Sequence, residues 1–80
     1  MNELEIKLKN VMSIVFELEP SKINDNSSPE NIENWDSLRH MMLIGALEDE
    51  FEIQFTDDQM LELLNYKLIK LILTEKLDKL

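Results

Sequence analysis

The stretch from Trp35 to Phe51 constrains the fold most strongly. The side chain of Asp36 can accept a hydrogen bond from a backbone N–H of a first helical turn, and an apolar-rich run begins directly after it. On a helix, four apolar residues of this run share one side: Leu43, Ile44, Leu47 and Phe51. The sequence therefore predicts a helix that begins at Ser37 and packs this side into a core.

A second apolar stripe lies on another side of the same predicted helix. It consists of Leu38, Met41, Met42 and Gly45. A chain of 80 residues forms only a modest core, which cannot easily bury both stripes. We therefore expect Leu38 and Met41 at the surface, where an apolar patch tends to mark contact with a ligand or partner. For Met42, surface exposure and core packing both remain open, since methionine also fills irregular gaps in a core.

A first helix is predicted over residues 2–17, followed by a long loop over residues 21–34. Pro20 marks the end of the helix, because proline cannot continue the helical hydrogen-bond ladder. The loop is rich in Asn, Ser, Asp and Pro, and a loop of this length in a compact domain is typically functional. Three apolar residues are expected to anchor it in the core: Ile23, Ile32 and Trp35.

Two further helices are predicted in the last third of the chain. Thr56 and Gln59 form a capping box, which predicts a short helix that ends at about Leu64. Asn65 caps a last helix over residues 66–77. Its lysines are expected on the solvent side: Lys67, Lys70, Lys76 and Lys79.

Together these patterns predict a single all-α domain over residues 1–80. The expected fold is a small four-helix bundle with three longer helices and one short helix. The long loop lies between the first and second helices. The sequence contains no internal repeat and no convincing strand pair.

The composition excludes several classes of function. With 17 acidic and 8 basic residues, the formal net charge is −9, so the surface should repel nucleic acid and attract basic protein patches. The chain has no cysteine, which excludes disulfides and thiolate metal sites, so any thiol chemistry must come from an added group. Neither a signal-peptide pattern nor an apolar run long enough for membrane insertion is present. We therefore expect a cytoplasmic protein.

Ser37 is the leading candidate for a functional residue. It falls at the start of the predicted central helix, where its hydroxyl is exposed. Unpaired backbone N–H groups and the positive end of the helix dipole favour an attached anion there, such as a phosphate diester. Serine is also common at helix starts for capping reasons alone, so this pattern leaves both interpretations open.

Other chemistry is poorly supported by the residues. His40 follows Ser37 by one helical turn, but a Ser–His nucleophile would need a Gly-rich elbow and an oxyanion hole, and neither is indicated. The span 25–36 has the length of an EF-hand loop, yet Pro29 stands at the fifth position and Glu30 replaces the turn glycine. We therefore predict no catalytic residue and no metal site. The acids Glu48, Asp49, Glu50 and Glu52 are expected to form a solvated face.

The residues around Ser37 resemble the acyl carrier protein family. The resemblance covers Glu33–Met41, with the family's Asp-Ser-Leu motif, and continues through Ala46–Ile53. It implies that the chain is not an enzyme and that Ser37 carries a phosphopantetheine arm, whose thiol holds an acyl group as a thioester. We expect a monomer, and the resemblance implies as its partners a phosphopantetheinyl transferase, which uses coenzyme A, and acyl-loading and acyl-processing enzymes with basic docking patches. By position, five residues match family sites for these partners: Asp36, Leu38, Met41, Glu48 and Asp49.

Three residues depart from the pattern of carriers in fatty acid synthesis. Arg39 and Met42 stand where those carriers commonly have acids, and Gly45 stands where they often have a larger apolar residue. The departures favour a specialised carrier, in a lipid, polyketide or polysaccharide-modification pathway. Two alternatives remain open: an aminoacyl carrier of the D-alanyl type, and a helical protein-interaction module without an arm.

The charge generates a first prediction. A net charge of −9 on so small a core should weaken the fold through self-repulsion, which salt screens. We expect the melting temperature, followed by circular dichroism, to rise as sodium chloride or a divalent cation is added. A melting temperature that stays flat across the titration would contradict this expectation.

Overall fold

The computed structural model describes residues 2–78. Within them the chain forms helices α1 (Glu3–Phe16), α2 (Ser37–Phe51), α3 (Asp57–Glu62) and α4 (Tyr66–Asp78), with a short 3-10 turn, η1 (Pro20–Lys22). The described residues contain no strand. The predicted all-α bundle is confirmed, with three longer helices, one short helix and a long loop between the first two. Lys79, predicted on the solvent side of the last helix, lies outside the described residues.

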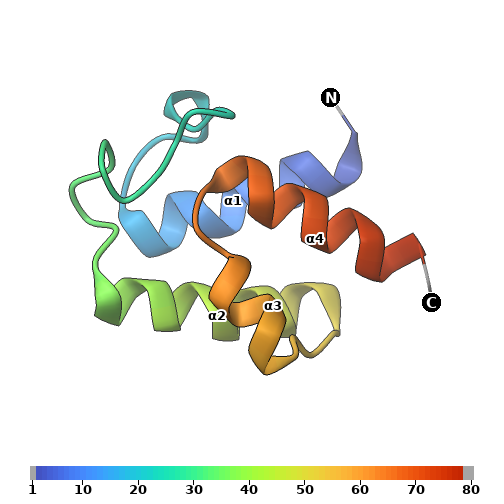
Figure 1. The fold of residues 1–80 in the computed structure, drawn as a ribbon. Coiled ribbons are helices and arrows are strands. Elements are labelled where there is room, and N and C mark those ends of the chain that lie inside the picture. Colours follow the sequence, from blue (N-terminus) through green and yellow to red (C-terminus); the bar gives the residue numbers. More distant parts are fainter. Residues whose placement is uncertain (1, 79–80) are drawn as a thin grey trace.

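The two longest helices run in opposite directions, so that the end of α1 lies beside the start of α2 (Figure 1). The loop between them closes this end of the molecule, while α4 packs against α1 and α3. Asp36 caps α2, its carboxylate accepting a hydrogen bond from the amide of Arg39 at 2.8 Å. The start of α2, where Ser37 lies, is therefore at the end of the bundle that the loop covers.

The core is formed by the faces that helical spacing predicted. Leu43, Ile44 and Leu47 of α2 are buried, and Phe51 packs partly buried against the same cluster. The three predicted anchors of the loop are also buried: Ile23, Ile32 and Trp35. Burial of apolar surface of this kind is the main stabilising contribution to so small a domain.

The second stripe of α2 faces outward. The exposed fractions are 72% for Leu38, 64% for Met41 and 52% for Met42. The predicted exposure of Leu38 and Met41 is confirmed, and Met42 joins them at the surface. An apolar patch of this kind, close to Ser37, is available for contact with another molecule.

Helix α1 ends within one residue of its predicted end, whereas helix α3 ends earlier than predicted. Helix α1 ends at Phe16, before Pro20, because Glu17 adopts the left-handed conformation with φ 56° and the next amide, of Leu18, bonds back to the Ser13 carbonyl. Pro20 begins η1 instead. Helix α3 ends at Glu62, two residues before the predicted end, where buried Leu63 turns the chain.

The prediction of solvated lysines on α4 is wrong for two of them. The Lys70 ammonium lies 2.9 Å from the Asp25 carboxylate and 5.3 Å from the centre of the Tyr66 ring. Lys76 is half-buried and donates a hydrogen bond to the side-chain carbonyl of Gln59 at 3.0 Å. The Lys76 ammonium also lies 6.0 Å from the centre of the Phe55 ring, so both charged ends lie over an aromatic ring and reach an oxygen atom, which periodicity alone does not reveal.

Gly45 offers a direct test of the helix. It lies on the exposed side of α2, and an added Cβ would meet no atom within 4 Å. Because glycine is the weaker helix former, we expect Gly45→Ala to raise the free energy of unfolding by about 1 kcal/mol in chemical denaturation. The matched control, Ala46→Gly, should lower it by at least about as much. A Gly45→Ala variant no more stable than the parent would contradict the assigned exposure.

Candidate functional site

Trp35 anchors the segment that precedes Ser37. Its side chain is buried, and its ring stacks on Phe16 of α1 with the ring centres 4.8 Å apart. Its indole Nε1–H donates a hydrogen bond to Nδ1 of His40, on the first turns of α2, at 3.0 Å. One side chain therefore fixes the end of the loop to both long helices.

Two polar side chains hold the end of α1 against the start of α2. Asn34 donates to the Phe16 carbonyl at 2.8 Å, and Arg39 donates to the Val15 carbonyl at 3.0 Å. Carbonyls at a helix end lack partners within the helix, so these bonds satisfy groups that burial would otherwise penalise. Arg39 also lies 3.2 Å from the Glu17 carboxylate. The arginine that departs from the fatty-acid carrier pattern thus has a structural role in this chain.

Ser37 is the first residue of α2, and its side chain is exposed. The predicted cap by Asp36 and the predicted exposure of Ser37 are both confirmed. The role of Ser37 as an attachment point stays a prediction. Backbone N–H groups of the first turn and the positive end of the helix dipole make this position favourable for an attached anion.

A groove of about 590 Å³ opens beside Ser37, and we call it the Ser37 groove. Its walls come from the loop, from α2 and from the segment that ends α3. They are mostly apolar: Pro29, Trp35, Met41, Leu63 and Leu64. Asp36, Ser37 and His40 supply its polar atoms. The sequence indicated no function for Leu63 and Leu64, because their approach to Ser37 depends on the packing of α3.

His40 is half-buried, and its neutral ring offers Ser37 no free lone pair. Its Nδ1 accepts the hydrogen bond from Trp35, so the neutral ring carries its proton on Nε2. The lone pair that would take a proton is therefore already used by the indole. Burial also lowers the pKa of His40 below its ordinary value. The geometry gives a Ser–His nucleophile no support.

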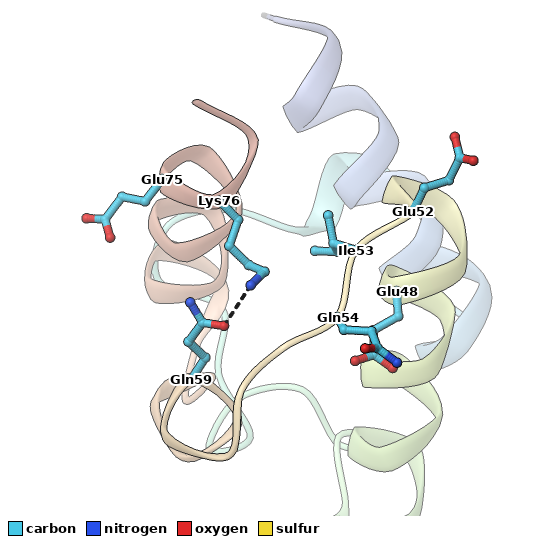
Figure 2. A pocket seen from close by; sticks show the side chains of 7 residues that line it. All are labelled: Glu48, Glu52, Ile53, Gln54, Gln59, Glu75 and Lys76. Atoms are coloured by element: carbon cyan, nitrogen blue, oxygen red, sulfur yellow. Dashed lines mark hydrogen bonds between the residues drawn. The ribbon is translucent and has the colours of Figure 1, made fainter. Parts of the chain in front are cut away.

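A second hollow, of about 630 Å³, lies at the opposite end of α2 and does not include Ser37. Figure 2 shows Gln59 and Lys76 on one side of it and Glu48, Glu52 and Gln54 on the other. The Glu48 carboxylate accepts a hydrogen bond from the Phe55 amide at 3.0 Å and is half-buried. The prediction of a fully solvated acidic face is therefore wrong for Glu48, which helps to hold the chain that follows α2.

The remaining residues predicted to bind partners are at the surface. Asp36 and Leu38 flank Ser37, and Met41 lies one turn further along α2. Asp49 is exposed near the other end of the helix. The structure thus places these side chains where another protein could reach them, and their role in binding stays a prediction.

Within residues 2–78, no group of three metal-binding side chains comes together, and no helix has the length and apolar character needed to cross a membrane.

Comparison with known proteins connects this arrangement to a family. The chain is 36% identical over 58 residues to the acyl carrier protein of Buchnera aphidicola subsp. Schizaphis graminum (strain Sg). The match covers 72% of this chain and 73% of that protein. The chain belongs to the acyl carrier protein family. No family model matches it.

Membership confirms the resemblance drawn from the residues around Ser37. Acyl carrier proteins are carriers and not enzymes, which agrees with the engaged lone pair of His40. They carry phosphopantetheine in general. The carrier fold described above brings an exposed serine, an apolar groove and an exposed apolar patch to one end of a helix.

The state of His40 predicts a pH dependence. Because burial lowers the pKa of His40 in the folded carrier below the unfolded value of 6.5, the unfolded chain binds the proton more readily below that pH. Its contribution to stability is therefore present above about pH 6.5 and is lost as the pH falls through the folded pKa. We expect the stability of the parent relative to His40→Asn to decrease as the pH is lowered from about 7.5 to about 5.5 in urea denaturation.

His40→Asn is the matched variant because its side-chain oxygen can accept the bond from Trp35 but does not titrate. The parent and the variant have the same carboxylates, so the effect of carboxylate titration on stability cancels in the difference between them. A stability difference that stays constant across this pH range would contradict the assignment.

Proposed function

We propose that this protein carries acyl groups as thioesters on a phosphopantetheine arm joined to Ser37 through a phosphodiester. The observation that carries the proposal is the position of Ser37: an exposed hydroxyl on the first residue of α2, directly behind the Asp36 cap, within the Asp-Ser-Leu run of the family. A phosphodiester there gains from the helix dipole and from free backbone donors.

The surroundings of Ser37 fit such an arm. The exposed side chain leaves space for attachment, and the Ser37 groove provides apolar walls for the hydrocarbon portions of pantetheine. When bound, the arm supplies the thiol that this cysteine-free chain lacks. The residues 1–80 act in this proposal as one carrier domain that works in the cytoplasm as a monomer.

The partners follow from the surface next to Ser37. A phosphopantetheinyl transferase would deliver the arm from coenzyme A, and acyl-loading and acyl-processing enzymes would then dock on α2. Exposed Leu38 and Met41 offer an apolar contact, while exposed Asp36 and Asp49 and half-buried Glu48 offer negative charge. A net charge of −9 favours rapid encounter with basic docking patches.

The pathway we favour is a specialised one: lipid, polyketide or polysaccharide modification. Arg39 and Met42 replace acids that carriers of fatty acid synthesis commonly present. The Arg39 side chain contacts the end of α1, and Met42 is 52% exposed. A docking enzyme would therefore meet a surface that is more apolar and less acidic than that of the fatty-acid carriers. Enzymes of fatty acid synthesis that recognise those acids should bind this surface less tightly.

Intact-protein mass spectrometry tests the proposal. The purified chain is incubated with coenzyme A, magnesium and a broad-specificity phosphopantetheinyl transferase. We expect the mass to increase by one phosphopantetheine in the parent and in the control Ser21→Ala, whose serine is also exposed, but not in Ser37→Ala. The attached arm can then be offered to acyl ligases and to aminoacyl ligases to identify the cargo.

Two results would change the assignment. If several transferases add no mass to the folded parent, the chain is better explained as a helical interaction module that binds through Leu38 and Met41. If only aminoacyl ligases load the arm, the cargo is of the D-alanyl type.

A further inference from the structure

We propose that His40 holds the phosphodiester on Ser37 by donating its Nε2–H to a phosphate oxygen, and so directs the arm along the Ser37 groove. The inference rests on the proposed attachment of the arm to Ser37. It gives a function to a histidine that takes no part in catalysis, and His40 is the single histidine of the chain.

The first support is position. His40 follows Ser37 by three residues on α2, and side chains with this spacing are neighbours on a helix surface, with Cβ atoms about 5–6 Å apart. Both residues line the Ser37 groove. A group esterified to the Ser37 hydroxyl therefore begins within reach of the His40 ring.

The second support is orientation. The hydrogen bond from Trp35 occupies Nδ1, and the His40 ring lies nearly parallel to the Trp35 ring, with an angle of 20° between their planes. Trp35 is itself fixed by burial and by its stacking on Phe16. The ring of His40 is thus set before any arm is attached, and Nε2–H is the donor that it has left to offer.

The third support is that no lysine or arginine of residues 2–78 lines the groove to compete with His40 for the phosphate. The groove residues come from the loop, from α2 and from the end of α3, and among them Asp36 is the other titratable side chain. It is acidic, and its carboxylate already accepts a hydrogen bond from the Arg39 amide. The guanidinium of Arg39 is directed to the end of α1, where it contacts the Val15 carbonyl and Glu17. A phosphate oxygen near Ser37 therefore finds its side-chain donor in His40.

The contact predicts a change in the titration of His40. In the chain without an arm, burial keeps the pKa of His40 below its ordinary value. An anion within hydrogen-bonding distance favours the charged imidazolium, and shifts of about one unit or more are typical of such pairs. Attachment of the arm should raise the pKa of His40 by about one unit, measured by proton NMR of its ring.

Phosphorus NMR of the arm-bearing protein is the most specific test. A phosphodiester does not itself titrate between about pH 5 and pH 8, and histidine is the side chain that ordinarily does. We expect the phosphorus resonance of the parent to move with a single pKa equal to that of His40. In the arm-bearing His40→Asn variant, which keeps an acceptor for Trp35, the resonance should stay constant over the same range.

The outcomes separate this inference from the proposed function. A phosphodiester resonance that does not move in the parent, or that moves equally in His40→Asn, would overturn the role of His40 and leave the carrier function in place. An unchanged pKa of His40 on attachment would overturn it as well. If no phosphodiester signal forms on the folded chain, the proposed function itself fails.

Discussion

The burial of Trp35 is the interaction on which the rest of this structure depends. Its ring closes the long loop by stacking on Phe16, and its indole N–H reaches His40 at the start of α2. Trp35 lies two residues before Ser37 in the sequence. Because the position of Trp35 is fixed, Ser37 is held at an exposed helix start and not in a flexible loop. Asn34 adds a bond to the end of α1. A rigid base of this kind suits the arm that we propose on Ser37.

Much of the fold could be predicted because it depends on short-range signals. The cap at Asp36 and the capping box at Thr56 are local hydrogen-bond patterns, and both are present in the structure. The buried stripe of α2 follows from helical spacing alone, and the exposed stripe followed from the small size of the core. The position of Ser37 at a helix start was therefore accessible from the sequence, together with its exposure.

The remaining features had no clear signal in the residue pattern, although several of them are local. Glu17 and Glu52 end helices in the left-handed conformation, where glycine would have been the usual signal. Glu48 was predicted to be solvated but bonds to a backbone amide seven residues away. The Ser37 groove could not be foreseen either, because it forms only when the end of α3 packs near α2. The bond between Trp35 and His40 was likewise seen only in the structure, although the two residues are just five positions apart.

The central claim is that Ser37 carries the arm in the living cell. It is tested most directly by isolating the chain from the cells that make it and fragmenting the peptide that spans Trp35 to Arg39 in a mass spectrometer. The account predicts one phosphopantetheine on this peptide, located on Ser37. An arm on any other hydroxyl, or a peptide that is unmodified under every growth condition, would contradict it.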